Sequence, residues 1–155
     1  MALLHKPIGN VNFTGDQLHF YYDPGMWSVD AQYIQLVVTK QAPPQKPQSE
    51  TTLQQIMVYY DTYECSQWNE IDQSCDWDFP FISGIAKTPS SVYQEGNSYY
   101  WNIRYWVEGE SFEQHHWVGS HDEPFTIIGT SIVIGCMDDG INTDYSDIRP
   151  VSFYS

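Results

Sequence analysis

The chain has 155 residues, with 20 acidic side chains against 6 basic ones and a formal net charge of −14. This length suits one domain with a sizeable core. So acidic a chain is a poor partner for nucleic acid or an anionic membrane surface, because both need Lys and Arg to neutralise phosphate.

The first half of the chain predicts short strands. Val11–Thr14 and Gln17–Tyr22 are expected to pair with each other around a turn at Gly15, and Ala31–Thr39 alternates and is rich in β-branched residues. The segment near 41–50 holds three prolines and predicts a mobile loop. Thr52–Asp61 fits either a helical face or a buried strand, and the β signals around it favour a strand.

The second half continues the same pattern. Cys65–Asp78 is polar and acidic and predicts a long loop, whereas Tyr99–Val107 is an aromatic strand. Two apolar runs follow within 125–135, and Ile148–Ser155 is expected to close the chain as a last strand. Short strands, frequent turn signals and no helix predict an all-β fold, a single-domain antiparallel β-sandwich over residues 1–155. The aromatic strand is similar to one in fibronectin-like and immunoglobulin-like sandwiches.

Targeting and redox signals are weak. The chain has no run of 18 apolar residues, so no membrane insertion through a helix is predicted. The N-terminus lacks a charged region followed by an apolar one, so no signal peptide is predicted, and a cytoplasmic location, export by another route and a removed leader all stay open. Without a secretory signal, Cys65, Cys75 and Cys136 are expected to be free thiols, although a Cys65–Cys75 bridge remains an alternative.

The most specific chemical signal is an acidic segment near the C-terminus. Six candidate oxygen ligands fall within ten residues, with no Lys or Arg among them: Asp138, Asp139, Asn142, Asp144, Ser146 and Asp147. Asp139–Gly140 is a favoured hairpin turn, which explains some of these residues as a solvated turn. Asp144 and Asp147 fall where an outgoing strand should start, and Asp is disfavoured in strands. Calcium takes six to eight oxygen ligands, so the segment favours a calcium site.

This segment, from Ile134 through Asp147, resembles the calcium loop of bacterial fucose/mannose-binding lectins that hold two calcium ions; the likeness covers roughly the last 25 residues. The resemblance implies calcium as cofactor, carbohydrate or glycoprotein as partner, and a homo-oligomer through the C-terminal strand. Asn142 stands where that family usually has Asp, and Ser146 where it has Asn, so fewer carboxylates are available. The implied metal ligands are Asp138, Asn142, Asp144, Ser146 and Asp147, and the implied sugar contacts are Asp139 and Asn142.

Other parts of the chain carry weaker signals. His115 and His116 would point to opposite faces of a strand, which disfavours a shared metal ion. Trp68, Trp77, Trp106 and Trp117 are candidates for stacking on a sugar ring, although most of them are expected to pack in the core. No known catalytic motif is present. The leading hypothesis is a calcium-dependent, lectin-like carbohydrate-binding protein. The alternatives are a structural or toxin-like interaction protein with a fold-stabilising acidic loop, and an enzyme acting on a small molecule.

Overall fold

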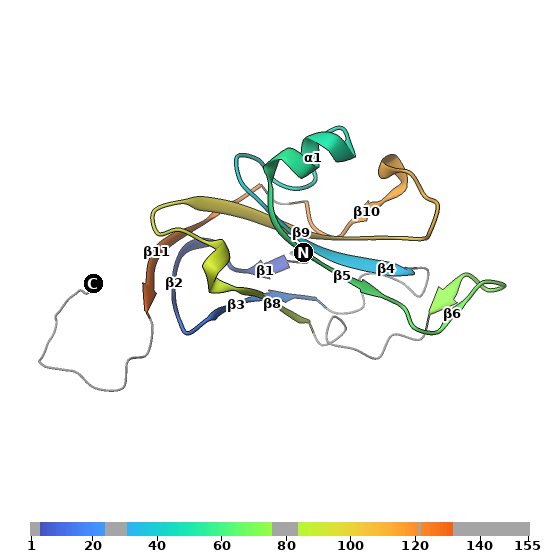
Figure 1. Cartoon of the computed structure of the whole chain (residues 1–155), viewed down its shortest axis with the longest axis horizontal. Coiled ribbons are helices and arrows are strands. Elements are labelled where there is room, and N and C mark those ends of the chain that lie inside the picture. The colour runs from blue at the N-terminus through green and yellow to red at the C-terminus, as the bar shows by residue number, and fades with distance from the viewer. Residues whose placement is uncertain (1–3, 24–30, 76–83, 121, 132–155) are drawn as a thin grey trace, which may run out of the picture.

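A computed structural model describes residues 4–23, 31–75, 84–120 and 122–131 of the chain. The described residues form an all-β fold in which two sheets face each other and a short helix lies on the outer side of the larger sheet (Figure 1). Within these residues no helix is long and apolar enough to cross a membrane. The predicted sandwich-like all-β class is therefore confirmed.

The small sheet has three antiparallel strands in the order β1–β3–β8. The strands are β1 (Leu4–Lys6), β3 (Gln17–Tyr22) and β8 (Ile85–Pro89). Buried and more exposed residues alternate along β3, so Leu18, Phe20 and Tyr22 enter the core while the residues between them face outward.

The large sheet has the order β2–β11–β9–β4–β5, and β10 pairs with the C-terminal end of β9. The only parallel pair among the described strands is β2 with β11; the other pairs of this sheet are antiparallel. Its strands are β2 (Gly9–Thr14), β4 (Tyr33–Thr39), β5 (Met57–Glu64), β9 (Ser98–Trp106), β10 (His116–Trp117) and β11 (Phe125–Ser131).

Strand β4, between β9 and β5, is buried along almost its whole length because both of its faces are covered. Ile34, Leu36 and Val38 face the main core between the sheets. Val37, on the other face, packs with Leu53 and Ile56 of helix α1 (Glu50–Ile56) in a second, smaller apolar cluster.

Aromatic side chains dominate the main core. Phe20 of the small sheet meets Trp101 of β9 edge-on, with ring centroids 4.9 Å apart, and Phe125 lies 5.9 Å from Phe20. The buried indole N–H of Trp101 donates to the carbonyl of Pro7 at 3.0 Å, which satisfies its polar atom. The two sheets are thus joined by rings rather than by shared strands.

Three sequence predictions are corrected here. Thr52–Asp61 is not one strand: Ser49 caps α1 by accepting a hydrogen bond from the Thr52 amide, and the chain changes to β5 only at Met57. The strands on either side of Gly15 exist but do not pair, because β2 joins the large sheet and β3 the small one. A fold without helices was expected, but the described residues contain one α-helix and two short 3-10 turns, Ser90–Val92 and Phe112–Gln114.

The expectation of free thiols at Cys65 and Cys75 is also wrong. The two residues form a disulfide, with Cα atoms 6.2 Å apart. Between them the predicted loop contains a small hairpin of two-residue strands, β6 (Trp68–Asn69) and β7 (Ser74–Cys75). Its tip is braced by Asn69, whose side-chain oxygen accepts hydrogen bonds from two backbone amides.

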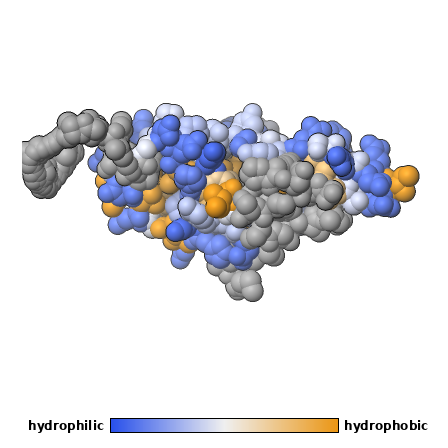
Figure 2. Space-filling model, turned by 90° about the horizontal axis from the view of Figure 1, so that it is seen from below, coloured by the Kyte–Doolittle hydropathy of each residue, from blue (hydrophilic) through white to orange (hydrophobic). Residues whose placement is uncertain are grey.

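The proline-rich segment forms the predicted loop between β4 and α1, and its Pro43 and Pro44 are buried. Its mobility stays a prediction. On the side of the molecule that lies at the bottom of Figure 1, most of the described residues are hydrophilic, and the apolar ones among them form small separate groups (Figure 2).

Candidate functional site: a groove over a buried arginine

The two faces of β9 have opposite chemistry. Tyr99, Trp101 and Ile103 belong to the main apolar core. Asn102 and Arg104 alternate with them and so point to the outer side of the sheet, yet they are only 1% and 3% exposed. A buried charge requires partners, because isolating an ion from water is costly.

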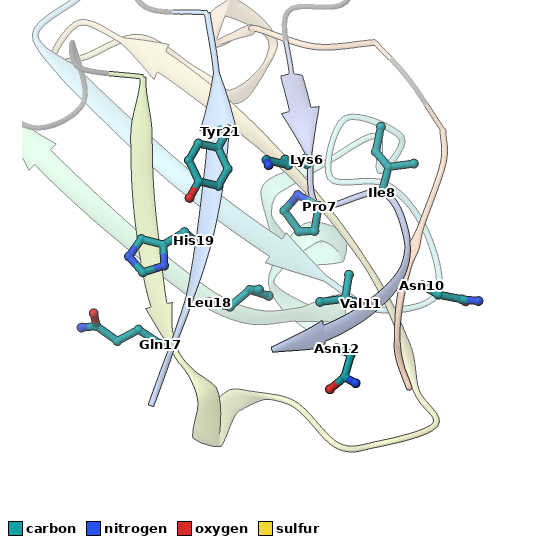
Figure 3. Close-up of a pocket in the computed structure, with 10 residues that line it drawn as sticks. All are labelled: Lys6, Pro7, Ile8, Asn10, Val11, Asn12, Gln17, Leu18, His19 and Tyr21. Atoms are coloured by element: carbon teal, nitrogen blue, oxygen red, sulfur yellow. The ribbon is translucent and has the colours of Figure 1, made fainter. Parts of the chain in front are cut away.

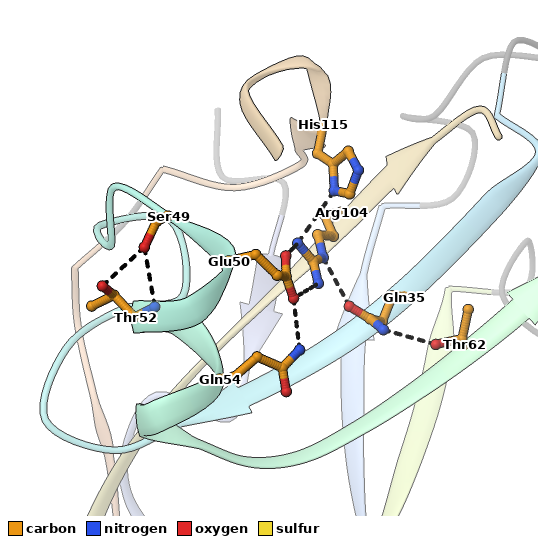
Figure 4. A network of polar contacts seen from close by, with 8 residues as sticks. All are labelled: Gln35, Ser49, Glu50, Thr52, Gln54, Thr62, Arg104 and His115. Atoms are coloured by element: carbon orange, nitrogen blue, oxygen red, sulfur yellow. Dashed lines mark hydrogen bonds and ion pairs between the residues drawn. The ribbon is translucent and has the colours of Figure 1, made fainter. Parts of the chain in front are cut away.

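Arg104 has such partners on several sides (Figure 4). Its Nη1 and Nη2 donate to the two oxygens of Glu50 at 2.8 and 3.1 Å, a bidentate pair. Its Nε donates to the side-chain oxygen of Gln35 at 2.8 Å, and the Gln35 amide donates in turn to Thr62 at 2.8 Å. One polar network therefore joins strands β4, β5 and β9 to helix α1.

Indole rings flank the guanidinium group. Its central carbon lies 5.3 Å from the ring centroid of Trp106 and 5.4 Å from that of Trp117. Such contacts stabilise a cation whose water has been removed. Arg104 is therefore held both by hydrogen bonds in its plane and by aromatic rings.

Glu50 reaches Arg104 because of where α1 begins. It is the first residue after the Ser49 cap, so its side chain starts from the end of the helix that lies over β9 (Figure 4). Hydrogen bonding from Arg104 is the main cause that lowers the pKa of the Glu50 carboxyl, and Gln54, which donates to it at 2.6 Å, acts in the same direction. Glu50 is thus an anion at neutral pH.

His115 completes the network from the segment after β9. Its Nδ1 lies 3.2 Å from Nη1 of Arg104, and its ring stacks on Trp106 with centroids 4.6 Å apart and planes 11° apart. Burial, followed by the Arg104 charge, lowers the pKa of His115. The neutral ring can accept the arginine hydrogen bond at Nδ1, which the protonated ring cannot do.

Two glutamates form part of the rim of a groove that lies over Arg104. Glu108 accepts a hydrogen bond from the Tyr33 hydroxyl at 2.6 Å, and this bond is the main cause that raises the pKa of Tyr33 to about 12. Glu110 accepts from the backbone amide of Val107 at 2.8 Å. The Tyr33 ring stacks beside Trp106 at 5.4 Å, so rim and floor are joined.

These elements enclose a groove with a volume of about 600 Å³. Its floor includes Arg104 and Trp106, and on one side stands the Tyr60 ring, which is 57% exposed at the edge strand β5. The described residues that line it are Gln35, Glu50, Gln54, Tyr60, Arg104, Trp106, Glu108, Gly109, Glu110, Phe112 and His115.

The groove combines an exposed ring with polar side chains that have unused hydrogen-bonding capacity. Each carboxylate oxygen can accept more than one hydrogen bond, so Glu108 and Glu110 can take donors from a ligand while keeping their present contacts. Among the described residues no three His, Cys, Asp or Glu side chains gather as metal ligands. The arrangement is suited to binding a polyhydroxylated molecule.

The residues predicted from the acidic segment lie outside the described part of the chain. This holds for the metal ligands and the sugar contacts alike, so calcium and its ligand set stay predictions. Of the four tryptophans, Trp106 lines the groove and Trp117 flanks Arg104, while Trp68 is in the small hairpin and Trp77 is not described.

The histidines diverge in the described structure, as expected for side chains on opposite faces. His115 stacks on Trp106, whereas His116 stacks on Tyr105, the preceding residue of β9, at 5.0 Å.

Sequence reasoning missed the groove itself. The sequence carries one signal for the groove: Arg104 is a lone basic residue in an otherwise aromatic strand. A strand buried on both faces cannot leave a cation unpaired, so Arg104 requires a partner. The partner could not be identified, since Glu50 is 54 positions away and was placed in a loop.

Comparison with known proteins adds little. No protein-family description matches the chain, and no curated protein is similar to it. Among solved structures, the soluble domain of PmoD from Methylocystis sp. strain Rockwell is similar with a TM-score of 0.39 and 9% sequence identity, over 75% of this chain and 76% of that one. A likeness this low carries no argument about function.

Proposed function

We propose that this chain is a non-catalytic carbohydrate-binding protein that holds sugar in the groove above Arg104. The observation that carries the proposal is that one groove is lined by the exposed Tyr60 ring, the carboxylates of Glu108 and Glu110 and the amide of Gln54. A sugar needs both features, since its ring has an apolar face and its rim is covered with hydroxyl groups.

The buried network gives the groove a fixed shape. Arg104 is satisfied by Glu50, Gln35 and the indole rings, so the floor does not have to rearrange when a ligand binds. Preorganisation of this kind reduces the entropy lost on binding. The rim glutamates are free to accept hydroxyl hydrogen bonds, and a pyranose can lie on the ring of Tyr60.

Calcium dependence is the second part of the proposal, and it rests on the sequence of the acidic segment 138–147. If calcium bridges protein and sugar, chelation abolishes sugar binding. If calcium only stabilises the fold, chelation lowers the melting temperature while sugar binding remains.

A glycan array with and without chelator tests the sugar claim first. The Tyr60→Ala variant should lose binding and Tyr60→Phe should keep it, because the ring and not the hydroxyl supplies the stacking surface. Ile85→Ala, which removes another exposed apolar side chain on the small sheet, is the matched control and should bind normally. Equal binding by Tyr60→Ala and the unchanged protein would remove the groove as the site.

Calcium titration by calorimetry tests the metal claim separately, with Asp144→Ala as the comparison. No heat from the unchanged protein contradicts the calcium hypothesis. A protein that binds calcium but no glycan points instead to a structural or toxin-like interaction protein.

A further inference from the structure

A second hollow lies away from α1, where strands β1, β2 and β3 come together (Figure 3). Its volume is about 390 Å³, within the range of small-molecule sites. It shares no lining residue with the groove, so binding at one can be measured independently of the other. The lining residues are Lys6, Pro7, Ile8, Asn10, Val11, Asn12, Gln17, Leu18, His19 and Tyr21.

The strand registers explain why the polar side chains gather here. Gln17, His19 and Tyr21 occupy alternate positions of β3 and share its outward face, because successive strand residues point to opposite sides. Lys6 is the cross-strand partner of Tyr21, and its ammonium nitrogen lies 4.7 Å from the centre of the tyrosine ring. A cation is therefore held at one end of the pocket by an aromatic ring.

The charge of this pocket is opposite to that of the whole chain. Among the described residues its lining contains no Asp or Glu, although the chain carries 20 acidic residues and a net charge of −14. Lys87, the cross-strand partner of His19, adds a second ammonium group on the same face. Asp16 and Asp23 stand just beyond the two ends of β3, and Asp23 is paired with His5.

The two lysines of this face have no carboxylate partner within the described residues. The ion pairs found there join His5 to Asp23, Lys46 to Asp122 and Arg104 to Glu50. The positive charge of Lys6 and Lys87 is therefore available to an anion from solution. The rest of the lining includes the amide side chains of Asn12 and Gln17 and an apolar floor with Pro7 and Leu18, whereas the Asn10 side chain points away from Gln17 (Figure 3).

We propose that this pocket is a binding site for a small carboxylate that also carries hydroxyl groups, such as a uronic acid. Lys6 receives the carboxylate, because a charged donor forms the stronger hydrogen bond to an anion. The side-chain amides both donate and accept, which matches hydroxyl groups. A bare phosphate would use the N–H donors of these amides but neither their carbonyl oxygens nor the apolar residues, since its oxygens at neutral pH are mainly acceptors.

A nitrogen-15 NMR titration of the full chain tests this site. The ligands are D-glucuronate, D-glucose, acetate and inorganic phosphate, and the signals followed are the backbone amides of residues 6–12 and 17–21. Glucuronate should shift these signals, whereas glucose lacks the charge and acetate lacks the hydroxyl groups, so both should bind at least about tenfold more weakly.

Three variants test which side chains contribute to glucuronate binding. Lys6→Gln should weaken glucuronate binding about tenfold. Asn12→Asp, nearly equal in shape, places a repelling carboxylate in the pocket and should also weaken it. Lys40→Gln removes an exposed lysine that does not line the pocket and should leave binding unchanged.

Several results would overturn the assignment: no glucuronate-dependent shifts in these signals, equal binding of glucose, or phosphate binding as tight as that of glucuronate. An equal loss of glucuronate affinity in Lys6→Gln and Lys40→Gln would mean that binding depends only on the net charge of the chain, and it would also reject the site. Failure of the groove to bind neutral glycans has no bearing on this titration.

Discussion

Replacing Arg104 with Met tests whether the floor of the groove is held by the ion pair with Glu50. Methionine keeps an unbranched apolar stem between Trp106 and Trp117 but removes the charge. Two consequences follow: Glu50 loses its cation, and the buried amide of Gln35 loses the donor to its oxygen. Both effects destabilise the folded state.

The size of the effect follows from burial. Breaking a buried ion pair by removing one partner costs about 3–5 kcal/mol, and a buried acceptor left unpaired costs about 1–3 kcal/mol. Glu50 retains 40% side-chain exposure, so water partly replaces the lost guanidinium and the lower ends apply. We expect a loss of about 3 kcal/mol in the free energy of unfolding, or roughly 6–12 °C in melting temperature for a chain of this size.

Urea unfolding followed by tryptophan fluorescence measures this loss. A double-mutant cycle with Glu50→Gln should give a coupling energy of at least about 1 kcal/mol, because the two side chains share one interaction. Lys46→Met is the control: its ion pair with Asp122 joins two side chains that are more than half exposed, so no measurable change is expected. A loss below about 1 kcal/mol in Arg104→Met, or strictly additive single changes, would refute the reasoning.

Further predictions concern pH, the disulfide and the helix cap. The Glu50 carboxyl has a folded-state pKa below its ordinary value of 4.5, so its ion pair contributes stability above that pH and this contribution should be lost as the pH falls through the lower folded pKa. Glu50→Gln should therefore lose less stability on acidification than the unchanged protein. The pKa of His115 is also lowered in the folded state, so the unfolded chain takes up a proton more readily and stability should begin to fall below pH 6.5. His115→Phe should remove this effect. An NMR titration that gave the folded ring an ordinary pKa would contradict it. Replacing Cys65 and Cys75 with Ser should lower stability by about 2–3 kcal/mol in chemical denaturation, whereas an unchanged midpoint would show that the bridge does not constrain the unfolded chain. Ser49→Ala should cost about 1 kcal/mol in the same assay, with Ser49→Asp as the variant that retains the cap and its stability.

The sequence predicted the strands well where their residues alternate or are β-branched. Tyr33–Thr39 and Ser98–Trp106 form where Ala31–Thr39 and Tyr99–Val107 were expected, because local preference and burial agree there. The segment after Ser49 was misjudged because Leu53 and Ile56 fit either a helix or a strand. The Ser49 cap and packing against Val37 decide between them.

Strand pairing could not be read from local sequence. The tight turn at Gly15 favoured a hairpin, yet β2 leaves β3 and pairs in parallel with β11, more than a hundred residues later. This choice buries Val11 and Ile127 against the same core, and a local pattern carries no information about so distant a partner.

The sequence by itself determined the all-β class, the acidic character of the chain and the calcium hypothesis for segment 138–147, since each follows from residue types and their spacing. Only the tertiary structure decided the groove and the cationic pocket. Arg104 and Glu50 meet because a capped helix lies across β9, and Lys6 meets Tyr21 because β1 and β3 are paired. Chemistry built from residues distant in sequence depends on which elements pair, and pairing is set by the packing of the whole core.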